Sequence, residues 1–127
     1  MSENTDRYEN AVARYFEAWN AGDPEALTKA VAAAWSVEGT YTDPLAAVTG
    51  HTEIAALIAG AQEQFPGFAF RPLATVDGHH DTARFAWELV SEADGSAPVA
   101  GFDVITLDAD GRIRSVLGFL DRVPAGA

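Results

Sequence analysis

The sequence predicts an α+β fold, in which three N-terminal helices pack on one face of a curved, mainly antiparallel sheet. Two observations support this class. Apolar residues recur at helical spacing in three segments of the first half, and most of the second half alternates between apolar and polar residues, as strands do. We expect a single domain over 1–127, with a core of about 8–122 and short flexible termini, because 127 residues suffice for one hydrophobic core.

The first helix is expected over 6–21, because its large apolar residues fall on one face of a helix. These residues are Tyr8, Val12, Tyr15, Phe16 and Trp19. Gly22 ends this helix, and Asp23-Pro24 supplies an N-cap and a first-turn proline for a second helix over 24–34.

A short strand over 35–42 and a third helix over 52–65 follow, with Pro66-Gly67 as the helix stop. The remaining sequence predicts four strands over 68–76, 82–92, 98–107 and 112–123. The turns between them are expected at 77–80, 94–96 and 108–111, where Asp, Gly and Ser concentrate.

Asp43 is the only carboxylate between Thr40 and His51, and it precedes a proline. Pro44 restricts Asp43 to extended geometry, which holds the carboxylate in a defined direction. Asp-Pro is also common turn chemistry, so the dipeptide by itself favours the end of a strand and the start of a loop.

Asp103 is expected on the inward face of its strand, because it alternates with apolar residues. Gly101, Ile105 and Leu107 share its side of the strand. An ionised carboxylate in such surroundings is costly, so its position requires an explanation.

Composition excludes several classes of protein. Nineteen acidic against eight basic residues give a net charge of −11, and Lys29 is the only lysine, so we expect neither a nucleic-acid nor a membrane partner. Cysteine is absent, which excludes disulfides and thiolate metal sites. The polar, acidic segment 1–10 does not resemble a secretion signal, and no apolar run approaches the roughly 20 residues of a membrane span, so we expect a cytoplasmic protein.

Several short motifs, in this order of elements, resemble the cone-shaped nuclear transport factor 2-like (NTF2-like) superfamily. They are Ala13-Arg14-Tyr15, Gly22-Asp23, Asp43-Pro44, Gly50 with Ile54-Ala55-Ala56, and Asp103-Val104 followed by Gly111-Arg112-Ile113. Within the superfamily, the chain resembles the SnoaL-like polyketide cyclases and the ketosteroid isomerases.

The resemblance implies three catalytic residues. Asp43 matches the general base of the ketosteroid isomerases, Tyr15 their oxyanion-donating tyrosine and Asp103 their protonated aspartic acid. It also implies a substrate pocket, which we expect to be lined by Trp19, Trp35, Tyr41, Ile58, Phe85, Trp87, Val116, Gly118 and Leu120. The isomerases have supporting tyrosines near Val31 or Trp35 and at Ile58, and a pocket tryptophan at Leu120, so the pocket differs in shape.

These features favour an enzyme, a cofactor-independent isomerase or cyclase that moves a proton on a small apolar carbonyl compound. One alternative is a non-catalytic module that binds a small molecule or a partner. A further alternative is an epoxide hydrolase-like enzyme, but that chemistry uses an Asp-Arg-Asp set, and no inward strand position holds an arginine.

We expect no cofactor and no metal site. His79-His80-Asp81 and Asp108-x-Asp110-Gly111 are interpreted as turns, because neither is followed by the further ligands that a metal needs. We also expect a homodimer formed through the outer face of the sheet, where Ala86, Val90, Phe102 and Val104 leave apolar area uncovered.

Overall fold

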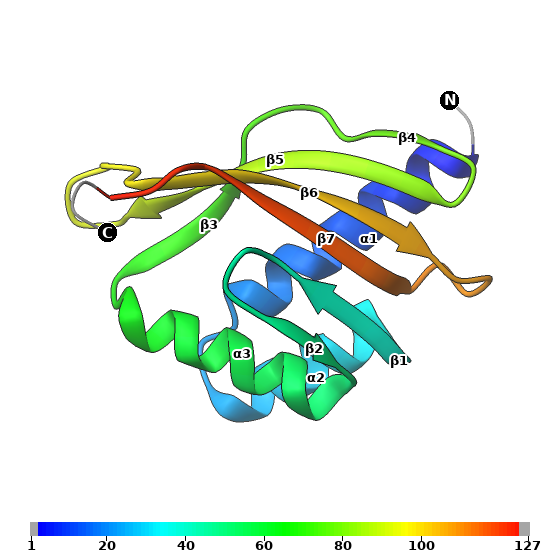
Figure 1. Cartoon of the computed structure of the whole chain (residues 1–127), viewed down its shortest axis with the longest axis horizontal. Coiled ribbons are helices and arrows are strands. Elements are labelled where there is room, and N and C mark those ends of the chain that lie inside the picture. Colours follow the sequence, from blue (N-terminus) through cyan, green and yellow to red (C-terminus); the bar gives the residue numbers. More distant parts are fainter. Residues whose placement is uncertain (1–2, 125–127) are drawn as a thin grey trace.

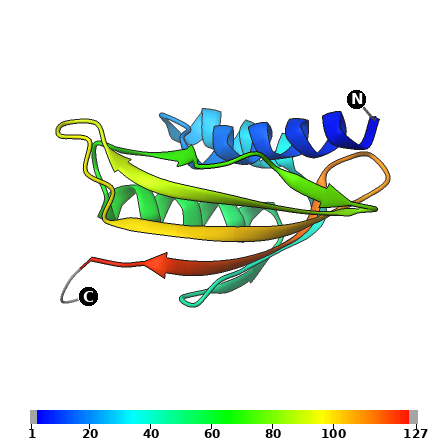
Figure 2. The ribbon, with the colours of Figure 1, turned by 90° about the horizontal axis from the view of Figure 1, so that it is seen from above.

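The computed structural model describes residues 3–124 and confirms the predicted fold class. Three helices lie along one face of a curved, seven-stranded sheet, as Figures 1 and 2 show from two directions. The helices are α1 (Glu3–Trp19), α2 (Pro24–Ala34) and α3 (His51–Gln64). No helix among the described residues is both long and apolar enough to cross a membrane.

The helix boundaries follow from local chemistry. The Asp23 side chain accepts a hydrogen bond of 2.8 Å from the Ala26 backbone N–H, as an N-cap residue does, and Pro24 occupies the first turn of α2. Helix α1 ends two residues earlier than predicted, because Ala21 already makes a tighter turn bond to Ala18.

The strands form one sheet in the order β2-β1-β7-β6-β5-β3, with β4 paired to β5. Their bounds are β1 Trp35–Thr42, β2 Ala47–Thr49, β3 Phe68–Pro72, β4 Asp77–His79, β5 Thr82–Ser91, β6 Val99–Leu107 and β7 Ile113–Arg122. All pairings are antiparallel except that of β1 with β7. This parallel pairing brings the segment before Asp43 beside the last strand.

Two short strands were not predicted, one predicted strand is four residues shorter than expected, and the three strands after it are each one or two residues shorter. Strand β3 ends at Pro72, and one further bond follows it, from the Leu73 N–H to the Ala86 carbonyl at 3.0 Å, so 73–76 is not strand. Residues 77–79, predicted as a turn, pair with β5 as β4, and the turn falls at His80 and Asp81. Strands β2 and β4 have three residues each, too few to show alternation.

The core lies between the helices and the inward face of the sheet. Along β6 buried residues alternate with partly exposed ones from Gly101 to Leu107, so Asp103 points inward. Tyr15 of α1 packs edge-on against Phe85 of β5, with ring centroids 5.1 Å apart. Aromatic packing of this kind fixes α1 across the sheet.

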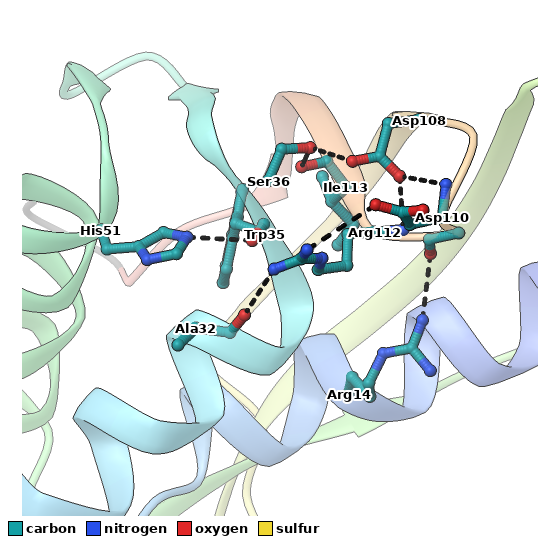
Figure 3. A network of polar contacts seen from close by, with 10 residues as sticks. Arg14, Ala32, Trp35, Ser36, His51, Asp108, Asp110, Arg112 and Ile113 are labelled. Carbon is teal, nitrogen blue, oxygen red and sulfur yellow. Dashed lines mark hydrogen bonds and ion pairs between the residues drawn. The ribbon is translucent and has the colours of Figure 1, made fainter.

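At the end of β6 next to β7, polar contacts join the β6–β7 hairpin to α1, α2 and β1 (Figure 3). We call it the hairpin cluster; its side chains are Arg14, Ser36, Asp108, Asp110 and Arg112. The Ser36 hydroxyl donates to Asp108 Oδ2 at 2.7 Å, and the Asp110 and Arg112 backbone N–H groups donate to Oδ1. Arg14 reaches from α1 to the Gly111 carbonyl at 3.0 Å. The Asp108 segment predicted as a turn is therefore held as a hairpin by its own aspartate.

Candidate active site

One cavity of about 450 Å³ lies between helices α1 and α3 and the inward face of the sheet. Most of its wall is aromatic or aliphatic, from Trp19, Leu45, Ala61, Phe65, Phe70, Trp87, Leu89, Val99, Phe119, Leu120, Val123 and Pro124. Its polar side chains are Tyr15, Tyr41, Asp43, Gln64 and Asp103. None of the described residues that line it is Lys, Arg or His, so the cavity combines apolar walls with two carboxylates.

Tyr15 and Asp103 form a buried pair within this cavity. The Tyr15 hydroxyl donates to Asp103 Oδ2 at 2.5 Å, and the two residues are 3% and 1% exposed. Asp103 Oδ1 has no hydrogen-bond partner among residues 3–124. One oxygen of a buried carboxyl group thus remains unsatisfied, which favours the protonated form.

Burial raises the pKa of Asp103 to about 6, because the ionised form loses its hydration. The Tyr15 hydroxyl and the Trp87 indole N–H favour the ionised form and offset part of this rise, whereas the negative charge of Asp43 adds to it. Trp87 Nε1 has no partner in hydrogen-bonding geometry among the described residues, so its influence on the carboxyl group is electrostatic. Below pH 6, Asp103 is therefore mainly a neutral acid.

Asp43 lies at the corner after β1 and is held by the protein on both of its oxygens. The Tyr41 hydroxyl donates to Oδ2 at 2.8 Å, and the backbone N–H groups of Leu45 and Ala46 donate to Oδ1 at 2.8 and 2.9 Å. The Asp43 backbone N–H donates in turn to the Ala46 carbonyl at 2.9 Å. The proline corner anticipated from the sequence is thus a closed turn that presents a fixed carboxylate.

Gly118 makes room for both carboxylates. It lies directly opposite Asp103 in the β6–β7 pairing. A β-carbon at position 118 would lie 2.8 Å from Asp103 Oδ1 and 3.3 Å from the Asp43 β-carbon. Any side chain here would displace one carboxyl group or the other, so glycine is required for them to share the cavity.

The two tyrosines stay protonated in this setting. Burial, followed by the negative charge of Asp103, raises the pKa of both Tyr15 and Tyr41 well above its ordinary value. Each therefore carries a hydroxyl proton at every pH at which the fold is expected to work.

The structure divides the anticipated pocket residues into two groups. Lining the cavity are Trp19, Tyr41, Trp87, Gly118 and Leu120, together with the three anticipated catalytic residues. The other four, Trp35, Ile58, Phe85 and Val116, do not line it; they are at most 3% exposed and pack in the core behind it. Strand alternation identified residues that face inward, but it did not distinguish those that line the cavity from those buried in the core behind it.

Several lining residues were not anticipated. Phe70 follows from the alternation of β3, since it faces the same side as Leu89, its partner on β5. Gln64 and Phe65 follow from their position in the last turn of α3 and just after it. Leu45, Val123 and Pro124 have no periodic pattern around them, and they are placed by the turn after Asp43 and the end of β7.

The other motifs lie outside the cavity. His80 has a positive φ of 50° in the β4–β5 turn, and its carbonyl accepts a bond from the Tyr8 hydroxyl. Within residues 3–124, no group of three or more His, Asp or Glu side chains is arranged to hold a metal ion. The two carboxylates and two tyrosines of the cavity bond in two pairs, Tyr15 with Asp103 and Tyr41 with Asp43.

The fold and this cavity define a class of proteins, the NTF2-like cone folds. A SnoaL-like protein from Jannaschia shares the fold, with a TM-score of 0.77 and 21% identity over 95% of this chain and 90% of its own. A SnoaL-like protein from Agrobacterium tumefaciens is more similar, with a TM-score of 0.86 and 40% identity over 91% of this chain and 98% of its own.

Sequence comparison specifies the family within that class. The model of the SnoaL-like domain matches residues 12–116. A steroid Δ-isomerase from Nocardioides simplex is 36% identical over 115 residues, which cover 86% of this chain and 85% of that protein. The chain therefore belongs to the SnoaL-like family, as its motifs predicted.

Proposed function

We propose that this protein is a cofactor-independent isomerase or cyclase that moves a proton on a small, neutral, apolar carbonyl compound. The observation that carries the proposal is the composition of the cavity, in which two carboxylates, two tyrosine hydroxyls and the Gln64 amide face a mainly apolar space of about 450 Å³. The similarity to a steroid Δ-isomerase supports the same class of chemistry.

In the proposed reaction, Asp43 is the base. It removes a proton from the carbon next to the substrate carbonyl, and the carbonyl oxygen takes up the negative charge of the enolate. The acid form of Asp43 then returns the proton to another carbon, so that no atom is gained or lost. The cavity has no cationic wall residue among those described, so it favours neutral substrates over anionic ones.

Tyr15 and Asp103 are the proposed donors to the enolate oxygen. While Asp103 is ionised, the Tyr15 proton is engaged by Asp103 Oδ2. Once Asp103 is protonated on Oδ1, which has no partner among the described residues, that O–H can donate to the substrate oxygen. The neutral acid also holds the Tyr15 proton less strongly than the carboxylate does, so the Tyr15 hydroxyl can turn to the same oxygen. Donors placed beforehand in an apolar site stabilise a developing charge strongly.

The test is solvent exchange and isomerisation. We expect the wild-type protein in D2O to introduce deuterium next to the carbonyl of β,γ-unsaturated ketosteroids or smaller enolisable ketones, measured by mass spectrometry. Ultraviolet absorbance of the conjugated enone follows isomerisation in parallel. Asp43→Asn is expected to lower the rate by about 10²–10⁴-fold, because the general base is lost.

Asp77→Asn is the matched control, since Asp77 lies on the exposed strand β4 far from the cavity lining and pairs with Arg84. It is expected to retain the wild-type rate. Ligand binding without exchange by the wild-type protein would instead identify a binding module and would contradict the proposed catalysis.

We also propose that two copies associate through the outer face of the sheet. Leu117 and Phe119 are 47% and 50% exposed. Phe119 also borders the cavity, but its ring stacks on that of Phe102, on the outer face of β6, with centroids 4.9 Å apart. Apolar area of this kind is typical of a contact surface. We expect a dimer in sedimentation at micromolar concentration, converted to monomer by Leu117→Glu but not by Ala33→Glu on the exposed side of α2.

A further inference from the structure

Tyr41 packs in the aromatic wall of the cavity and also makes a hydrogen bond to Asp43. It lies two residues before Asp43, so the side chains of both lie on the same side of the chain at the end of β1. Its ring packs against Trp19 at 5.6 Å, and its hydroxyl donates to Asp43 Oδ2 at 2.8 Å. The residue is 4% exposed and lines the cavity.

The bonds to Asp43 divide its carboxylate into two different halves. Oδ1 accepts two backbone bonds from the turn, from Leu45 and Ala46, and both of its lone pairs are used. Oδ2 accepts one bond, from Tyr41, and keeps one lone pair free. Oδ2 is therefore the oxygen that can take a proton from a substrate, and Tyr41 is its one hydrogen-bond partner among the described residues.

We infer that Tyr41 is a positioning residue that fixes the rotation of the Asp43 carboxylate and turns the free lone pair of Oδ2 towards the substrate. The inference rests on the proposed function, because it assigns Tyr41 a role through the proposed base. A base that is misaligned by a small rotation loses much of the advantage of proximity. Tyr41 suits the task because its hydroxyl remains protonated, and its ring is held by Trp19.

Tyr8 provides a matched control within the same chain. Its side chain is 5% exposed, and its hydroxyl donates one bond of 2.7 Å to the His80 carbonyl, outside the cavity lining. Tyr41→Phe and Tyr8→Phe each remove one buried hydroxyl and one hydrogen bond. A difference between the two variants therefore reports the bond to Asp43 and not the loss of a hydroxyl in general.

The first readout is kinetic, on whichever enolisable ketone the wild-type protein turns over. Tyr41→Phe is expected to lower kcat at least about tenfold while KM changes less than about threefold, because positioning acts in the transition state. Tyr8→Phe is expected to retain the wild-type kcat. In an Asp43→Asn background, Tyr41→Phe is expected to have no further effect, since the group it positions is gone. Equal losses of kcat with and without Asp43 would overturn the inference.

The second readout does not depend on activity. Amide hydrogen exchange of Leu45 and Ala46, whose N–H groups bond the other oxygen of Asp43, is expected to be about fivefold faster in Tyr41→Phe and unchanged in Tyr8→Phe. If the wild-type protein showed no turnover but exchange were faster in Tyr41→Phe, the proposed reaction would be contradicted, while the positioning of Asp43 by Tyr41 would be supported. Exchange at the wild-type rate in Tyr41→Phe would overturn the positioning itself.

Discussion

Asp103 lies within β6 and Asp108 directly follows it, yet the pKa of Asp103 is raised and that of Asp108 is lowered. Asp103 lies within β6, is 1% exposed and accepts one hydrogen bond, and burial raises its pKa to about 6. Asp108 follows the last residue of β6 and accepts bonds from Ser36, Asp110 and Arg112. Desolvation acts to raise the pKa of Asp108 too, but these donors outweigh it and lower the pKa.

The comparison teaches that burial and the number of donors together decide the charge of a carboxyl group at each end of β6. At the hairpin end, three donors satisfy the carboxylate and make it a structural anchor. At the cavity end, burial raises the pKa of Asp103, and Oδ1 has no partner among the described residues to offset the loss of hydration. The unsatisfied oxygen is the property that suits Asp103 to donate to a substrate.

The largest expected effect is on the pH dependence of stability in Asp103→Asn. Between about pH 4 and pH 6 the folded wild-type protein holds a proton that the unfolded chain has lost, so its stability falls as pH rises through this range. The rise of the Asp103 pKa from 3.8 to about 6 corresponds to a loss of about 3 kcal/mol. We expect Asp103→Asn to gain about this much relative to wild type between pH 4 and pH 8 in urea unfolding.

The net charge of −11 also destabilises the protein at high pH, but it is nearly the same in wild type and Asp103→Asn, so it cancels when the two are compared.

Asp108→Asn is the contrasting variant. Its lowered pKa means that ionised Asp108 stabilises the fold above about pH 4 and stops doing so as pH falls. We expect Asp108→Asn to be less stable than wild type by about 1–2 kcal/mol at pH 8, and by less near pH 3. If the free energy of unfolding of wild type and of Asp103→Asn had the same pH dependence, Asp103 would have an ordinary pKa, and the contrast with Asp108 would be wrong.

A smaller effect is expected from Trp87→Phe. The Trp87 indole N–H favours ionised Asp103, so its removal should raise the pKa of Asp103 further, by less than about one unit. The measurement is the carboxyl carbon signal of Asp103 in NMR, assigned with Asp103→Asn. Trp35→Phe is the matched control, because Trp35 also has a buried Nε1 without a partner among the described residues but does not line the cavity. Equal shifts in both variants would show a general packing effect.

Much of the fold could be predicted because long elements carry a repeated pattern. Helix α2 and strand β1 have the bounds that capping and alternation indicated. Strands β2 and β4 escaped prediction, since three residues contain no period and their pairing is decided by the strand beside them.

The candidate site was predicted in part for a related reason. Alternation placed Asp103 inward, and the structure has it there. The bond of Tyr41 to Asp43 had a signal in the sequence, since residues two apart in a strand share a face, but alternation does not specify which neighbours bond. The core positions of Trp35 and Phe85 follow from how deeply α1 sits on the sheet, which no local pattern records.

The parallel pairing of β1 with β7 has a consequence for the order in which the protein is assembled. Thr42 pairs with Leu117, so Asp43 reaches its place only once the last strand has joined the sheet. A nascent chain that ends at Leu107 already contains Tyr15, Asp43 and Asp103, but it lacks the strand that lies between β1 and β6. Pairing between segments so far apart in the chain is slow, because a long loop must close first. We therefore expect the pocket to close only after β7 has been synthesised and has joined the sheet between β1 and β6.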